Sequence, residues 1–390
     1  MIRFLIFIFL DVLAFSGILI VILPFLAKNL GASIFIVTIL FATFSLFQLF
    51  VSPFWGSLSD KYGRKPLLIL NCFAEILANI LLLVSGSIIL IFFSRIVAGL
   101  FKTNVSVGTA YIADITDNQN RAKGMGLFGM AFGLGFTIGP LLGGIIAGSN
   151  YSNETLSFVI LIAIGINIAN LLYVVLFVNE TKKNNSSNLN KQTTNKNLLS
   201  QFNIIKSKEL IFLFLIVFIL HFNFSGMEST IALWSNATFS WGPKEIGILM
   251  TSAGLVQILI QGGLLRILLA KFNEEQLIKS SSFALFFGFL TIATGKLLLI
   301  PLAISLLCYG MGIGNPCLNS LISKKSPSEE RGLALGAAYS SQAAARVMGQ
   351  PFAGLLALLM FKDAPYFASA IIIIFSIIVY FFIKNRAYKT

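Results

Sequence analysis

The sequence is poor in charged residues, histidine and cysteine, and each scarcity excludes a class of protein. Only 11% of the 390 residues are charged and the mean hydropathy is +0.89, which excludes an ordinary soluble domain. With His221 as the single histidine, a Ser-His-Asp set or a histidine-based metal centre is difficult to build, so no enzyme, cofactor or metal site is expected. The cysteines Cys72, Cys308 and Cys317 lie in apolar runs without metal-ligand spacing and are predicted to be small apolar fillers.

Apolar sequence is what the chain has in abundance. Because about 20 mostly apolar residues cross the roughly 30 Å hydrocarbon layer of a bilayer, the pattern predicts an all-α membrane protein. Short polar turns separate the apolar stretches, which gives twelve predicted transmembrane helices near residues 3–25, 34–56, 66–85, 87–113, 124–148, 155–178, 209–233, 245–268, 279–295, 298–321, 333–360 and 366–383.

The net charge of +13 is distributed with a strong bias along the chain. If Arg3 is cytoplasmic, most Lys and Arg residues fall in cytoplasmic segments, and the few in outer segments are Lys28, Lys244, Lys296 and Lys362. This bias follows the positive-inside rule, so the basic balance predicts orientation and lipid contact, with no nucleic-acid partner. The bias predicts a multi-pass protein of the cell inner membrane with both termini cytoplasmic. The first helix is expected to be retained and not cleaved as a signal peptide, because Asp11 interrupts its apolar run.

A polar tract divides the chain in the middle. It is rich in Asn, Ser, Lys and Thr, and it predicts a flexible cytoplasmic linker over residues 179–208. The division predicts two pseudo-symmetric six-helix bundles, residues 1–178 and 209–390, of the kind that move against each other around a central site. A decayed copy of the 56–66 segment near residues 262–274 supports a repeat, with Asn273 expected in a left-handed turn where the first copy has glycine.

The segment Gly56–Pro66 carries the strongest motif. Gly56 is expected to let helices approach closely, Gly63 to permit a tight turn with positive φ, and Pro66 to suit the first turn of the next helix. Asp60 beside Lys61, Arg64 and Lys65 supplies charges that pair in one conformation and separate in another. The alternative, a basic anchor loop, explains the cations but leaves Asp60 and the glycines unexplained.

Small residues line one face of the fifth predicted span. Spacings of four residues place glycines on a face that permits backbone-to-backbone packing, while a proline loosens the local hydrogen-bond ladder. An ordinary tight helix contact is the alternative interpretation. The residues concerned are Gly135, Gly139, Pro140, Gly143 and Gly144.

Both motifs resemble those of a known family. The first matches the G-x-x-x-D-[RK]-x-G-[RK]-[RK] signature of the major facilitator superfamily, and the second resembles the antiporter motif of its drug:proton exporters. Three further features resemble the tetracycline-efflux branch, namely Leu10-Asp11 in the first span, Asp114 ending the fourth, and Gly226-Met227-Glu228 in the seventh. The resemblance implies the major facilitator fold, alternating access, and export of drug-like compounds in exchange for protons.

Ionisable residues within predicted spans are site hypotheses, because a charge in hydrocarbon is costly unless it is paired or hydrated. Six such residues occur: Asp11, Glu75, Arg95, Lys102, Glu228 and Arg346. Counting about 1.5 Å per residue places Asp11 and Arg95 near the midplane, so an Asp11–Arg95 pair is expected, with Lys102 as a second possible partner.

Three polar stripes at helical spacing accompany these charges. His221 and Glu228 share a face of the seventh span, where Glu228 is a candidate proton carrier and His221 is expected to satisfy a local carbonyl. Arg346 lies between two glutamines in the eleventh span. The third stripe, Asn71, Glu75 and Asn79, has interhelical packing as its alternative interpretation.

The sequence therefore predicts a secondary active transporter, a monomer whose partners are protons, a small lipophilic or drug-like compound and the bilayer. Proton binding by Asp11 or Glu228 is expected to weaken a charge pair and favour the inward-facing packing. A proton-coupled metabolite importer of the same fold is the main alternative, and a non-transporting receptor or scaffold is a remote one.

Overall fold

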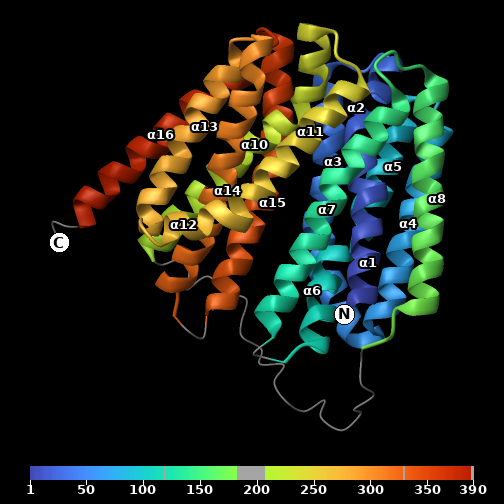
Figure 1. Cartoon of the computed structure of the whole chain (residues 1–390), viewed down its shortest axis with the longest axis horizontal. Helices are drawn as coiled ribbons and strands as arrows, with labels where there is room; N and C mark the ends of the chain where they lie inside the picture. Colours follow the sequence, from blue (N-terminus) through green and yellow to red (C-terminus); the bar gives the residue numbers. More distant parts are fainter. Residues whose placement is uncertain (118–119, 182–206, 328–329, 388–390) are drawn as a thin grey trace. The chain divides into compact units, whose positions relative to one another are not determined.

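The computed structural model describes residues 1–117, 120–181, 207–327 and 330–387, and it is helical along nearly all of them (Figure 1). Most of the predicted linker, residues 182–206, lies outside the described residues. The segments of the first half are α1 Ile2–Asp11, the π-helix η1 Val12–Ile18, α2 Leu19–Asn29, α3 Ile34–Tyr62, α4 Arg64–Leu83, α5 Ile88–Phe101, α6 Asn104–Ile115, α7 Arg121–Ala147 and α8 Asn153–Phe177. Those of the second half are α10 Lys208–Phe239, α11 Pro243–Leu259, the π-helix η3 Ile260–Leu264, α12 Leu265–Leu269, α13 Glu274–Ala293, the 3-10 helix η4 Leu297–Leu299, α14 Ile300–Lys325, α15 Arg331–Leu359 and α16 Ala364–Ala387.

Each predicted span coincides with a helix or with a run of consecutive helical segments. Within the described ranges, ten of these runs are long and apolar enough to cross a membrane. The other two predicted spans are α15, which is long but less apolar, and α16, whose described apolar part is Ala364–Phe375. The prediction of an all-α, multi-pass membrane fold is confirmed.

Contacts group the chain into two units. Unit 1 comprises Met1–Asn184 and Ser229–Leu255, and unit 2 comprises Asn185–Glu228 and Val256–Thr390. This grouping differs from the predicted bundles, since it places Ser229–Leu255 with the first half of the chain. The predicted boundaries, residues 1–178 and 209–390, stay a prediction.

The first span, α1–η1–α2, lies in the interior of unit 1, since it contributes to both of that unit's apolar cores. Around Phe4 and Phe7 of α1, the ring of Phe4 stacks on Tyr111 of α6 with a centroid separation of 4.0 Å. Around α2, Ile22 and Phe25 pack with side chains of α8. In the same unit α4 and α8 run alongside each other (Figure 1).

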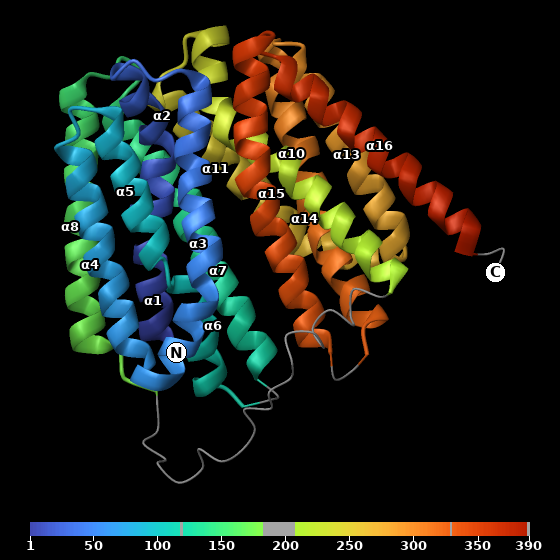
Figure 2. The same cartoon turned by 180° about the vertical axis from the view of Figure 1, so that it is seen from behind.

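Unit 1 also contains the last third of α10, from Ser229 on, and most of α11. Thr251 Oγ1 of α11 donates to the Thr137 carbonyl of α7 at 2.9 Å. A Cβ on Gly144 of α7 would lie 2.6 Å from the Pro243 carbonyl, so these two helices approach backbone to backbone. In unit 2, α13 packs against α14 and α16 (Figure 2).

Three local expectations are changed by the fold. The segment 56–62 is the helical end of α3 and not a loop, so only Gly63 separates α3 from α4. A Cβ on Gly56 would meet nothing within 4 Å, which contradicts the close approach expected there. Asn273 has φ −79° and caps α13 by accepting from the Gln276 N–H, so the expected left-handed turn was wrong: its side chain satisfies a helix terminus instead.

Candidate functional site

Asp11 is the last residue of α1 and is completely buried in unit 1. Lys102 Nζ donates to Asp11 Oδ2 at 2.9 Å and also pairs with Glu75. Asn104 Nδ2 donates to the same Asp11 oxygen at 2.6 Å, and Asn71 Nδ2 donates to the other at 2.7 Å. Glu75 is 2% exposed and Lys102 is 4% exposed. These five residues form the buried charge cluster, with two carboxylates around one ammonium group.

A break in the fourth span delivers Lys102 to this cluster. Helix α5 ends at Phe101 and α6 begins at Asn104, while Lys102 is extended with φ −71° and ψ 97°. The Thr103 N–H freed by the break donates to Asn71 Oδ1 at 3.1 Å. The signal for this break was the polar triplet Lys102-Thr103-Asn104 within an apolar run, which the sequence analysis did not use.

The expected Asp11–Arg95 pair is not present, and this expectation was wrong. Among the described residues no carboxylate lies within 4 Å of Arg95, whose Nη2 donates to Ser94 Oγ at 3.0 Å. The ring of Phe15 in η1 lies near both cations, with its centroid 5.4 Å from Arg95 Cζ and 4.6 Å from Lys102 Nζ. Asp11 instead contacts Lys102, the second partner considered, because the break between α5 and α6 turns that side chain inward.

The glycine face of α7 packs against the π-helix that directly follows Asp11. A Cβ on Gly17 of η1 would lie 2.7 Å from Gly139 Cα and 2.8 Å from the Gly135 carbonyl. On Gly143, a Cβ would lie 2.9 Å from the Ile18 carbonyl. The predicted backbone-to-backbone contact is confirmed, and its partner is the first span. Pro140 lies inside α7, and one turn later Gly144 meets α11 as described above.

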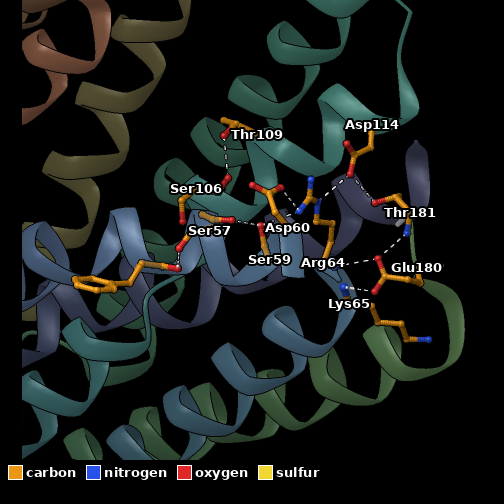
Figure 3. Close-up of polar contacts among 12 residues, drawn as sticks. Ser57, Ser59, Asp60, Arg64, Lys65, Ser106, Thr109, Asp114, Glu180 and Thr181 are labelled. Atoms are coloured by element: carbon orange, nitrogen blue, oxygen red, sulfur yellow. Dashed lines mark hydrogen bonds and ion pairs between the residues drawn. The ribbon is translucent and has the colours of Figure 1, made fainter. Parts of the chain in front are cut away.

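A second charged network in unit 1 joins α3, α4 and α6 (Figure 3). Arg64 at the start of α4 pairs with Asp60 at 2.7 Å and with Asp114 at 2.9 Å. Gly63 adopts φ 99°, as predicted for a tight turn, and this turn places Arg64 beside the end of α3. The Asp60 side chain is 72% exposed, so this pair is open to water.

Two residues that the sequence analysis missed complete this network. Glu180, just after α8, accepts from the backbone N–H groups of Arg64 and Lys65 at 2.9 and 3.0 Å. It therefore occupies the N-terminus of α4, where an anion is favoured by the free N–H groups and the helix dipole. Thr181 Oγ1 donates to Asp114 Oδ2 at 3.0 Å (Figure 3). A carboxylate directly after an apolar run was the available signal.

The remaining cations of the motif point elsewhere. Lys65 Nζ donates to the Val175 carbonyl of α8 at 2.7 Å. Lys61 Nζ lies 5.1 Å from the centroid of the Tyr62 ring. Within the motif, Arg64 thus pairs with the acidic groups, whereas Lys65 donates a hydrogen bond to α8.

The polar residues of unit 2 form a looser arrangement. His221 Nε2 lies 3.5 Å from Asn315 Oδ1, and Gln342 Nε2 donates to that same oxygen at 3.4 Å. Over the described part of the chain, neither Glu228 nor Arg346 makes an ion pair within 4 Å, although Arg346 acts electrostatically on Glu228 and on His221. Glu228 is partly buried, and Arg346 is exposed.

A family comparison decides what this arrangement belongs to. Residues 4–350 match the model of the Major Facilitator Superfamily, which covers most of the chain, including both charged networks and the glycine face. The chain belongs to the Major Facilitator Superfamily.

Individual relatives agree with this membership. The chain is 28% identical over 304 residues to the tetracycline resistance protein, class H, of Pasteurella multocida, covering 77% of this chain and 74% of that protein. It resembles the solved structure of the human organic anion transporter MFSD10 (TETRAN) with a TM-score of 0.70 and 23% identity, covering 96% of this chain and 97% of that one. The solved structure of the nucleoside transporter NupG gives a TM-score of 0.78 at 13% identity, covering 97% of each chain.

Membership in the Major Facilitator Superfamily makes the protein a membrane transporter and not an enzyme, as the sequence predicted. The predicted resemblance to the tetracycline-efflux branch is confirmed by relatives named as tetracycline resistance proteins. Since the solved structures are below 25% identity, they support the fold alone.

Proposed function

We propose that this transporter exports a small lipophilic or drug-like compound in exchange for protons, cycling by alternating access. The observation that carries the proposal is the buried charge cluster at the start of η1, because it joins proton-binding groups to the glycine contact of α7. Relatives described as tetracycline and multidrug resistance proteins support export and a drug-like cargo. The positive-inside bias supports an inner-membrane location with both termini cytoplasmic.

The buried charge cluster has the composition required to exchange one proton. With both Asp11 and Glu75 ionised, two negative charges surround the single ammonium of Lys102, and one added proton makes the cluster neutral. Glu75 Oε2 has no hydrogen-bond partner among the described residues and is a free position for that proton. Protonation weakens the bonds of Lys102 to the carboxylates, since charge-assisted hydrogen bonds are about twice as strong as neutral ones.

The π-helix η1 connects this event to the helix packing. It begins at the residue after Asp11, and its Gly17 touches Gly139 of α7. π-helical turns are rare and frequently lie at functional sites. A change at Asp11 thus reaches α7, and through Gly144 it reaches α11.

The network around Arg64 is proposed to be the cytoplasmic switch. Its pairs with Asp60 and Asp114 join three helices in this conformation, and their separation would release the ends of α3 and α6. Such discrete rearrangements of ion pairs accompany rigid-body motions in transporters and other switching proteins. The membrane potential supplies about 2.3 kcal/mol per charge at 100 mV to drive the cycle.

The test is transport by the purified protein in liposomes with an imposed pH gradient. A panel of dyes and drugs is offered to the native protein and to Asp11→Asn, Glu75→Gln and the matched control Glu154→Gln, whose carboxyl is exposed at the start of α8. Gradient-driven movement is expected to fall at least about tenfold in the two cluster variants and to persist in the control, since each removes one titratable group from the cluster.

Movement of cargo against the proton gradient supports export, and movement with it supports the proton-coupled importer instead. Unchanged gradient-driven movement in both cluster variants would remove the buried charge cluster from the coupling mechanism. Absence of flux for every compound would favour a non-transporting receptor.

A further inference from the structure

Arg346 is an exposed cation in the middle of the eleventh predicted span. It lies 15 residues after the first residue of α15, or about 22 Å along the helix axis. In the described ranges no carboxylate lies within 4 Å of its guanidinium, and its side chain has no hydrogen bond. Helix α15 is long enough to span a membrane but is not among the ten runs that are apolar enough.

An unpaired guanidinium at this depth cannot face hydrocarbon without a cost of several kcal/mol. It therefore faces water, and its charge is balanced by a group that the chain does not supply at ion-pair distance. Guanidinium groups bind carboxylate and other oxyanions through two parallel hydrogen bonds, which is the chemistry that would complete this position.

The surroundings of Arg346 favour a ligand with an aromatic or apolar body. Tyr339 lies seven residues earlier on the same face of α15 and is 62% exposed. Gln342, on the intervening turn, is bonded to Asn315, which also faces His221. Arg346 is thus flanked by an exposed ring and by a glutamine that is already engaged.

We infer that Arg346 binds an anionic group of the cargo, so that the transported compound is an organic anion whose apolar or aromatic body lies along Tyr339. This inference rests on the proposed function, because it assigns the exposed face of α15 to the cargo path. It narrows the cargo from any drug-like compound to one that carries a carboxylate, a sulfonate or an acidic hydroxyl.

Substitution of Glu228 is expected to change anion binding in the opposite direction to substitution of Arg346. Arg346 acts electrostatically on the Glu228 carboxylate, although the two form no ion pair. An ionised Glu228 competes with an anionic ligand for the field of Arg346, and a neutral Glu228 does not. Replacing Glu228 by glutamine is therefore expected to strengthen anion binding, while replacing Arg346 by glutamine weakens it.

The test compares two dyes with the same ring system and opposite charge, the anion carboxyfluorescein and the cation rhodamine 123. Equilibrium binding to the purified full chain is measured for the native protein, Arg346→Gln, Arg346→Lys, Glu228→Gln and the control Arg331→Gln at the start of α15. The native protein is expected to bind the anion more tightly than the cation. Arg346→Gln is expected to weaken anion binding about 10- to 100-fold, the range for loss of a charged hydrogen bond.

Arg346→Lys is expected to retain part of the affinity, and Arg331→Gln is expected to match the native protein. Equal or weaker native binding of the anion, or anion binding unchanged in Arg346→Gln, overturns the inference. The proposed function fails separately, when neither dye moves under a pH gradient although anion binding still depends on Arg346. Gradient-driven movement that depends on Asp11 but not on Arg346 leaves the proposed function standing and removes the anion site.

Discussion

Units 1 and 2 differ in whether charged residues in the middle of their predicted spans are buried and paired. In unit 1, Asp11, Glu75 and Lys102 are all buried and contact one another. In unit 2, Glu228 and Arg346 interact electrostatically but form no ion pair, and Arg346 is exposed. A closed cluster exchanges a small ion such as a proton without opening, whereas an open cation accommodates a larger ligand. On this contrast we propose that unit 1 couples the ion and unit 2 recognises the cargo.

Removing the cation of the closed cluster should have the largest effect. Lys102→Met leaves two carboxylates buried without a counter-charge, and breaking a buried ion pair in this way costs about 3–5 kcal/mol of folding stability. Thermal denaturation in detergent measures the change, with Lys296→Met in an exposed turn as the control. Adding Asp11→Asn to Lys102→Met should recover part of the loss, since it removes one uncompensated charge. A Lys102→Met protein as stable as the native one would show that the cluster is not held together by its charges.

The glycine contact that follows the cluster should be the next most sensitive feature. A Cβ on Gly139 would meet the backbone of Gly17 and would lie 2.9 Å from the Leu13 carbonyl. Gly139→Ala is therefore expected to cost about 1–3 kcal/mol, as overpacking does, and to slow transport.

The matched control for this prediction is Gly133→Ala in the same helix, where an added Cβ meets nothing within 4 Å. Its denaturation temperature should equal or exceed that of the native protein, because alanine is the better helix former. If both variants lose the same stability, close packing at η1 does not explain the glycine face.

A smaller effect is expected at the N-terminus of α4 in unit 1. Glu180→Gln removes the negative charge at the N-terminus of α4 and replaces one of the two carboxylate oxygens that accept from the Arg64 and Lys65 N–H groups, so a loss of about 1 kcal/mol is expected. The loss should shrink further at high salt, since screening weakens exposed charges. Denaturation at low and high ionic strength measures both, and a loss independent of salt would argue against the dipole interaction.

Arg346, an exposed cation of unit 2, should contribute least to stability. Arg346→Gln is expected to change the folding free energy by less than about 0.5 kcal/mol, as exposed substitutions usually do. The same denaturation assay that detects the loss in Lys102→Met measures it. Destabilisation by several kcal/mol would mean that Arg346 is a structural residue, and the contrast between the units would disappear.

The helices were largely predictable from the sequence, because each one has to satisfy its own backbone hydrogen bonds in lipid. Helix ends were predicted less well where a motif looked like a loop. Residues 56–62 extend α3 because no residue there ends a helix before Gly63, which adopts φ 99°. The glycine face of α7 was predictable as a contact, but its partner η1 was not, since small residues specify close approach and not what approaches.

The sequence by itself determined that this chain spans the membrane many times, which side chains are charged within it, and which family it belongs to. These properties follow from composition and local spacing, which do not depend on the fold. Only the tertiary structure decided which charges meet. Lys102 rather than Arg95 reaches Asp11 because the fourth span breaks between Phe101 and Asn104, and a one-residue change in helix register there rotates a side chain by about 100°.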